Sequence, residues 1–86
     1  MMATSVTCKT KARLPMPIAG LAIYIFTNGN WLFIGTTGDD GIIEVGILYP
    51  PPFTLQINPL GAYYDPAYET LEQPITGDCT VLVGSA

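Results

Sequence analysis

The segment 21–34 reads Leu-Ala-Ile-Tyr-Ile-Phe, then Thr-Asn-Gly-Asn, then Trp-Leu-Phe-Ile, so two apolar runs flank Asn28-Gly29. Asn-Gly between two apolar runs is the strongest short-range signal for a β-hairpin, because both residues tolerate the positive φ of a two-residue turn. The segment therefore predicts a hairpin whose strands are 20–27 and 31–37.

Both faces of this hairpin are apolar. Successive strand residues point to opposite faces, so aliphatic residues share the core face and four aromatic residues share the other face. A sheet in water usually has one polar face, and a chain of 86 residues has little mass with which to bury both. We expect the aromatic face to dock against another molecule; the alternative is that an N-terminal arm or the loop 58–67 folds over it. The aromatic face comprises Tyr24, Phe26, Trp31 and Phe33, with Tyr24 opposite Phe33 and Phe26 opposite Trp31, and the core face comprises Leu21, Ile23, Ile25, Leu32 and Ile34.

The length and composition predict one small domain with few charged residues, spanning residues 1–86. The net charge is −4, with three basic residues and no His, which disfavours a nucleic acid partner and an anionic membrane surface. Charged residues make up 12% of the chain, about half of the usual 25%. So few charges would leave a monomer poorly soluble, whereas a subunit covered by neighbouring chains tolerates them.

The N-terminus carries no predicted targeting segment. Met1-Met2-Ala3-Thr4-Ser5 lacks the charged and apolar regions of a signal peptide, and no apolar run approaches the length of a transmembrane span. We therefore expect synthesis in the cytoplasm and no membrane partner.

Short strand candidates follow one another with turn residues between them. No segment of ten or more residues has helical periodicity, and regularly spaced short strands are typical of a sandwich or barrel. We expect an all-β, seven-stranded antiparallel Greek-key β-sandwich of the transthyretin or immunoglobulin-like kind, with a turn at 74–78. The expected strands are 4–13, 20–27, 31–37, 42–47, 53–57, 68–73 and 79–83.

Two cysteines, Cys8 and Cys79, lie on the first and last predicted strands. If these strands pair, a disulfide is feasible and would contribute about 4 kcal/mol by the loop-entropy model. The alternative is a pair of small buried thiols. The chain has no Cys-x-x-Cys or His-containing metal motif.

Little in the sequence supports catalysis or a cofactor. There is no His, and neither Cys is placed beside a base. Asp39 and Asp40 stand in Gly38-Asp39-Asp40-Gly41, where Asp-Gly favours a turn, and a calcium site would need more oxygen ligands than this turn and Glu44 provide. We expect a protein that is not an enzyme and that holds neither cofactor nor metal.

Tyrosines on the loop side of the predicted sheet form a second candidate contact surface. Tyrosine suits interfaces, since its ring is apolar and its hydroxyl polar, so this group predicts a carbohydrate or protein contact. The alternative is that these rings cap a small core. The residues are Tyr63, Tyr64 and Tyr68, together with Tyr49.

Five segments follow one another in a characteristic order. They are 17–24 (proline, glycine, then an apolar strand), 36–41 (Thr-Thr-Gly-Asp-Asp-Gly), 48–55 (leucine, prolines, aromatic, x, leucine), 61–64 (Gly-Ala-Tyr-Tyr) and 80–83 (the closing strand). This order resembles that of the carboxypeptidase regulatory-like domains over about residues 5–84. The resemblance implies a transthyretin-like seven-stranded sandwich and a non-catalytic accessory, adhesive or structural module. The Gly that the family has in its Pro-Gly turn is replaced here by Pro51 or Pro52.

Taken together, these features predict a structural subunit of a larger assembly. A virion decoration, cement or accessory protein of a phage capsid or tail fits the low charge and the two-faced hairpin best, with other protein chains of the assembly, or further copies of this chain, as partners. The alternative is an adhesin-like module at a cell surface that binds carbohydrate or protein.

Overall fold

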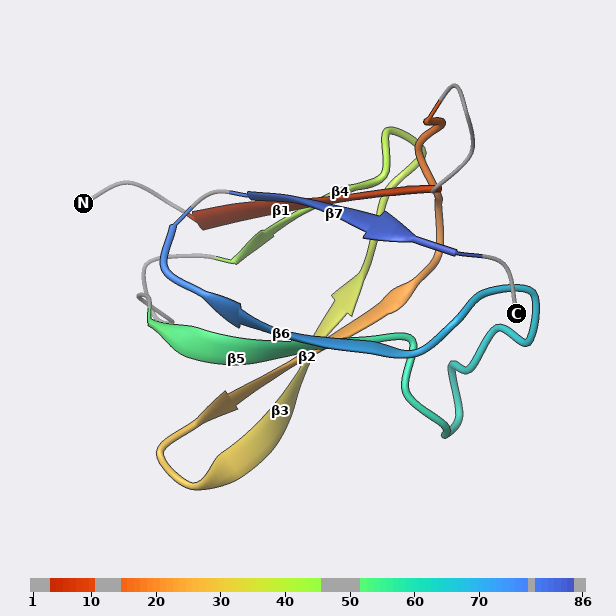
Figure 1. Ribbon diagram of the computed structural model, residues 1–86. Coiled ribbons are helices and arrows are strands. Elements are labelled where there is room, and N and C mark those ends of the chain that lie inside the picture. The colour runs from red at the N-terminus through yellow and green to blue at the C-terminus, as the bar shows by residue number, and fades with distance from the viewer. Residues whose placement is uncertain (1–3, 11–14, 46–51, 78, 85–86) are drawn as a thin grey trace.

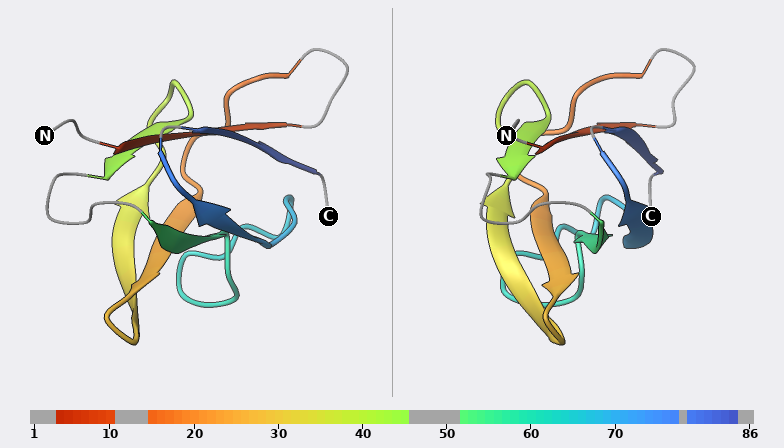
Figure 2. Two further views of the ribbon diagram at one scale, coloured as in Figure 1. Left: turned by 60° about the vertical axis from the view of Figure 1, so that its left-hand side comes forward. Right: turned by 90° about the vertical axis from the view of Figure 1, so that its left-hand side faces the viewer.

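The protein folds as two β-sheets that lie one above the other (Figures 1 and 2). The structure is a computed structural model that describes residues 4–10, 15–45, 52–77 and 79–84, and these contain strands and turns but no helix. The all-β class predicted from the sequence is confirmed. The strands are β1 (Thr4–Thr10), β2 (Ala22–Thr27), β3 (Asn30–Thr36), β4 (Ile42–Val45), β5 (Phe53–Ile57), β6 (Leu71–Ile75) and β7 (Cys79–Val83).

The larger sheet has four strands in the order β3-β2-β5-β6, and each pair of adjacent strands in it is antiparallel. The turn at Asn28-Gly29 joins β2 to β3, as antiparallel pairing allows, whereas β2 and β5 are separated in the chain by β3 and β4. β3 and β6 form the two edges of this sheet. The β2–β3 hairpin extends past the other strands, so its tip projects from the body of the molecule (Figures 1 and 2).

The smaller sheet has the order β4-β1-β7 and is mixed. β1 pairs with β4 in antiparallel and with β7 in parallel orientation, so the expectation of a wholly antiparallel fold is wrong for the β1–β7 pair. Parallel neighbours need a long crossover connection, and almost the whole chain lies between these two strands. Local turn signals fix the direction of consecutive strands, but they carry no information on how the first and last strands pair.

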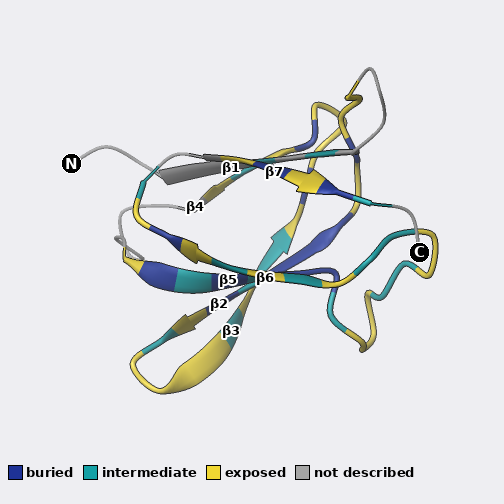
Figure 3. Ribbon diagram, in the orientation of Figure 1, coloured by how far each residue is buried: buried dark blue, intermediate teal, exposed yellow. Residues whose placement is uncertain are grey.

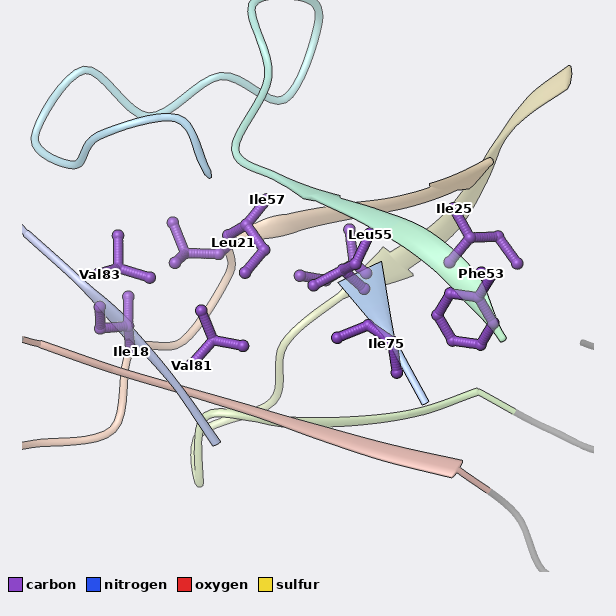
Figure 4. Packing of buried hydrophobic residues seen from close by; sticks show 10 residues of the cluster. Ile18, Leu21, Ile25, Phe53, Leu55, Ile57, Ile75, Val81 and Val83 are labelled. Carbon is purple, nitrogen blue, oxygen red and sulfur yellow. The ribbon is translucent and has the colours of Figure 1, made fainter. Parts of the chain in front are cut away.

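The core lies between the two sheets, and its buried hydrophobic side chains, as far as the structure describes them, are aliphatic except for Phe53. The alternation along β5 buries Phe53, Leu55 and Ile57 and leaves Thr54 and Gln56 partly exposed. Each fully buried side chain of this size contributes about 1.5–3 kcal/mol. The cluster is drawn in Figure 4 and consists of Ile18, Leu21, Ile23, Ile25, Phe53, Leu55, Ile57, Ile75, Val81 and Val83.

The observed β6 differs from the strand predicted at 68–73. It runs from Leu71 to Ile75 and so includes Pro74, which the sequence placed in a turn. Pro74 lies opposite Thr54 of β5. Because β6 is an edge strand, its outward backbone groups have no neighbouring strand, and a proline there removes no ladder hydrogen bond.

Candidate functional site

The hairpin forms as predicted and places its aromatic residues on one face. Asn28 and Gly29 have φ values of 52° and 80°, the positive angles that a two-residue turn requires. Tyr24 lies opposite Phe33 and Phe26 lies opposite Trp31, so both predicted cross-strand pairs are confirmed. The observed β3 starts one residue earlier than expected, at Asn30.

The rings of these pairs are in direct contact. The centroids of Tyr24 and Phe33 are 5.2 Å apart with an interplanar angle of 56°, and those of Phe26 and Trp31 are 5.1 Å apart with an edge-to-face angle of 60°. Such tilted geometries bring the positive edge of one ring to the negative face of another. A fifth ring, Tyr63, stacks on Phe33 with a centroid distance of 4.6 Å and an angle of 4°.

Tyr63 thereby extends the aromatic face of the hairpin, which from here on denotes five residues: Tyr24, Phe26, Trp31, Phe33 and Tyr63. Four of these side chains remain open to solvent: the exposed fractions are 40% for Phe26, 41% for Trp31, 42% for Phe33 and 52% for Tyr63. The hairpin end of the sheet is accordingly among the exposed parts of the ribbon in Figure 3. The aromatic face is therefore a continuous apolar surface on the outside of the molecule.

The other face of the hairpin lies in the core, as expected. Ile23 and Ile25 are fully buried, and Leu32 and Ile34 pack partly buried against the same cluster. The hairpin thus has two apolar faces of which the molecule itself covers one.

Polar side chains continue the aromatic face across the sheet. Tyr24 lies opposite Gln56, and Gln56 lies opposite Glu72. Directly opposed residues of antiparallel strands project to the same face, so an amide and a carboxylate stand beside the rings. The outer surface of this sheet is aromatic at the β3 edge and polar towards the β6 edge.

A bulge in β3 separates the aromatic face from the part of β3 that approaches the smaller sheet. Ile23 pairs with Gly35 and Tyr24 pairs with Phe33, which leaves Ile34 as the extra residue. Gly35 has a φ of 149°, and a Cβ there would lie 3.3 Å from Cδ1 of Ile43 on β4. A bulge bends its strand and increases the local twist, which here brings β3 close to β4. The sequence pattern of alternating residues gave no sign of this insertion.

Asn58 fixes the loop that carries Tyr63. Its side chain is fully buried: Nδ2 donates to the carbonyl oxygens of Asp65 (2.8 Å) and Tyr68 (3.1 Å), and Oδ1 accepts from the Asp65 N–H (2.8 Å). The Thr70 hydroxyl donates to the Asn58 carbonyl (2.7 Å). The loop therefore wraps around the side-chain amide of Asn58, whose nitrogen and oxygen both form hydrogen bonds with the loop backbone.

Asn58 was not identified as important from the sequence. Its φ is 54°, a conformation that Asn adopts more readily than other residues with a Cβ. The one sequence signal for this role is an Asn directly after an alternating strand. That signal is weak, because Asn is also common in ordinary solvent-exposed turns.

The predicted tyrosine group is divided by the fold. Tyr63 joins the aromatic face, whereas Tyr68 packs partly buried against the core. Tyr64 is half-buried, and Tyr49 lies outside the described residues. The loop 58–67 thus reaches the aromatic face at Phe33 but does not fold over it, and Phe26 and Trp31 stay exposed.

The two cysteine positions lie on neighbouring strands. β1 pairs with β7, and the register places Val81 opposite Cys8 and Val6 opposite Cys79. The cysteines are therefore offset along the ladder and do not directly oppose each other. Their side chains lie outside the described part of the structure.

The acidic turn 38–41 has a structural role. Oδ1 of Asp40 accepts from the Ile42 N–H at 3.0 Å, and the Gly41 N–H donates to the Gly38 carbonyl at 2.8 Å. Within the described ranges, no three His, Cys, Asp or Glu side chains come together as a metal site would require. Likewise, none of the described segments is a helix of the length and apolarity needed to span a membrane.

No protein-family model matches the chain, and no curated protein or solved structure is significantly similar to it.

Proposed function

We propose that this protein is a non-catalytic structural subunit that docks through its aromatic face onto another protein chain of a larger assembly. The observation that carries the proposal is the set of four adjacent rings exposed by 40–52% on the outside of a sheet whose inner side is a packed core. Contiguous exposed apolar surface on a small domain marks a contact site.

The chemistry of the aromatic face favours a protein partner. Aromatic residues are enriched and charged residues depleted at the centres of protein interfaces. Residues 14–38, which contain the whole hairpin, carry no charged side chain. Burying this surface would contribute several kcal/mol at roughly 25 cal/mol per Å² before the cost of association is subtracted.

We also propose a finer description of the fold, a seven-stranded Greek-key sandwich similar to the carboxypeptidase regulatory-like domains. Support comes from the connections: the chain passes from the larger sheet to the smaller one between β3 and β4, returns between β4 and β5, and crosses again between β6 and β7. Modules of that kind serve as accessory or structural units.

For its setting we propose a virion, with the chain as a decoration, cement or accessory protein of a capsid or tail. Support comes from the charged fraction of 12% and the open aromatic face, since a subunit largely covered by neighbours needs few surface charges. The partner would then be a major protein of the particle.

A second candidate function is an adhesin-like module that binds carbohydrate. The observation that favours it is the position of Gln56 and Glu72 in line with Tyr24 on the same outer face. A few polar groups beside apolar rings can orient a ligand by hydrogen bonds. A glycan array probed with folded protein tests this candidate, and a negative array counts against it.

The docking proposal is tested with a matched pair of variants. Trp31 on the aromatic face and Leu82 on β7 of the other sheet are exposed to similar extents, 41% and 44%. We expect Trp31→Ala to weaken co-sedimentation with the partner particle by about 2 kcal/mol or more, while Leu82→Ala leaves it unchanged. Equal losses from both variants, or none from Trp31→Ala, would contradict docking through the aromatic face.

A further inference from the structure

One edge of the larger sheet offers unpaired backbone groups. The two-residue turn makes Thr27 and Asn30 a hydrogen-bonded pair, and such pairs alternate with non-hydrogen-bonded pairs along an antiparallel ladder. The pairs that contain Trp31 and Phe33 are therefore non-hydrogen-bonded, and their N–H and C=O groups point away from β2. Among the described residues, none provides these groups with a backbone partner.

The β3 edge also lacks the residues that usually protect an edge strand. Charged side chains and proline on an edge prevent pairing with another chain. The opposite edge, β6, carries Glu72 and Pro74, whereas β3 reads Asn-Trp-Leu-Phe-Ile-Gly-Thr without charge or proline. The outer edge β4 of the smaller sheet carries Glu44. The bulge at Ile34 interrupts β3, so the apolar edge without charge, proline or bulge is the segment 30–33.

We propose that two copies of this chain pair through β3 in antiparallel orientation, with Leu32 on the two-fold axis. Trp31 then opposes Phe33 of the second copy, and Phe33 opposes Trp31 of the second copy. Because both residues point their backbone groups outward, this register forms two hydrogen-bonded pairs with four N–H···O bonds. It places Leu32 of the two copies in the close, non-hydrogen-bonded pair between them.

This register also joins the aromatic residues of the two copies. Directly opposed residues share a face. Phe26 and Trp31 of one copy therefore lie in one row with Phe33 and Tyr24 of the second copy. The two-fold symmetry produces a second row of the same four residues. Aromatic cross-strand pairs stabilise antiparallel ladders. The two four-stranded sheets become one continuous sheet with a doubled aromatic surface on one side.

A second copy fits this edge because the β3 residues that would face each other across it carry no charge. The chain has a net charge of −4, but all of its acidic residues lie outside 14–38. A two-fold contact brings the same surface patch together from both copies, so pairing through β3 opposes only neutral side chains. Pairing through β6 would instead bring Glu72 of each copy close to the other and would encounter Pro74.

The pairing is independent of the proposed docking function, since it uses the edge of β3 and leaves the aromatic face open. It is tested by sedimentation equilibrium of the purified full chain at concentrations up to roughly 1 mM, the range in which weak specific contacts are detected. We expect a reversible monomer–dimer equilibrium. A monomer throughout this range overturns the proposal, whether or not the chain co-sediments with a particle.

Two substitutions of Phe33 distinguish backbone hydrogen bonding at the β3 edge from contacts made by the Phe33 ring. Phe33→Thr and Phe33→Pro both remove the ring, but only proline also removes the outward N–H, which an edge strand tolerates. We expect the dimer dissociation constant of Phe33→Pro to exceed that of Phe33→Thr at least about tenfold, because each dimer loses two hydrogen bonds. Equal dissociation constants for the two variants would overturn pairing through the backbone edge.

The register is tested on the unmodified protein, so this test does not depend on how any variant folds. In a mixture of isotope-labelled and unlabelled chains, a filtered nuclear Overhauser experiment reports contacts between copies. We expect a contact between the Hα atoms of Leu32 in the two copies, because non-hydrogen-bonded antiparallel pairs bring their Cα atoms to about 4.5 Å. Contacts between copies that leave out β3 would overturn the proposal.

Discussion

Tyr63 lies flat on Phe33, with ring centroids 4.6 Å apart and planes within 4° of parallel. The contact joins the loop after β5 to the edge strand β3, although no backbone ladder connects these two segments. It shields one side of Phe33 while Tyr63 itself stays 52% exposed. The loop therefore extends the aromatic face and does not close it.

The Tyr63–Phe33 contact predicts a moderate effect on stability. Tyr63→Ala should lower the free energy of unfolding by about 1 kcal/mol, the usual contribution of an aromatic pair, and Tyr63→Phe should have little effect because the stack is retained. Urea denaturation measures both values. A loss from Tyr63→Phe as large as that from Tyr63→Ala would show that the hydroxyl, and not the stack, holds the loop.

Asn58 should be among the most sensitive positions of the chain. Asn58→Ala leaves the Asp65 N–H and the Tyr68 carbonyl without their partner and removes one of the two donors to the Asp65 carbonyl, which keeps the Tyr68 N–H. It also forces alanine into a positive φ, so we expect a loss of about 3 kcal/mol or more. Thermal and urea unfolding measure the loss.

Asn58→Gly is the matched control, since it removes the same hydrogen bonds but accepts the φ of 54° without strain. We expect it to be destabilised less than Asn58→Ala by about 1 kcal/mol. Asn28→Gly, at the other positive-φ asparagine, removes only an exposed turn residue and should change stability little. A small effect of both Asn58 variants would mean that the loop does not depend on this amide.

The C-terminal end of β7 is held to the segment before β6. The Gly84 N–H donates to Oε1 of Glu69 (2.8 Å) and the Glu69 N–H donates to the Gly84 carbonyl (3.0 Å). Glu69→Ala should cost about 1–2 kcal/mol and accelerate hydrogen exchange of the Gly84 amide, whereas Glu69→Gln retains an acceptor oxygen and should be milder. Unchanged exchange at Gly84 in Glu69→Ala would contradict this role.

Substitutions of Trp31 and Ile25 should differ in their effect on stability, because Trp31 lies on the surface and Ile25 in the core. Ile25 is fully buried, whereas Trp31 is 41% exposed, so we expect Ile25→Ala to lower the unfolding free energy by about 3–4 kcal/mol and Trp31→Ala by only about 1–2 kcal/mol. The far-ultraviolet spectrum of Trp31→Ala should match that of the unmodified chain. Unfolding of the isolated Trp31→Ala protein would place this ring in the core and remove the basis for docking.

The hairpin could be predicted from the sequence because its signals are local. Asn28-Gly29 fixes the turn, the turn fixes the register, and the register places Phe26 opposite Trp31. The same reasoning identified which residues face the core, since Ile23 and Ile25 alternate with aromatic neighbours.

The features that escaped prediction depend on contacts between distant parts of the chain. The parallel β1–β7 pair, the bulge at Ile34 and the position of Tyr63 follow from how the two sheets and the loop meet. Pro74 was assigned to a turn because its compatibility with a strand depends on β6 being an edge. For Asn58, only the fold reveals that several backbone groups converge on one side chain.

The central claim is that the chain belongs to a larger assembly, and sedimentation of the native protein from its source lysate, followed by immunoblotting, tests it most directly. We predict that the protein travels with a particle of megadalton mass and that Trp31→Ala, introduced into the same source, reduces the bound fraction. If the native protein instead stays at the top of the gradient with free 9.2 kDa chains, the account is contradicted, and carbohydrate binding becomes the stronger candidate.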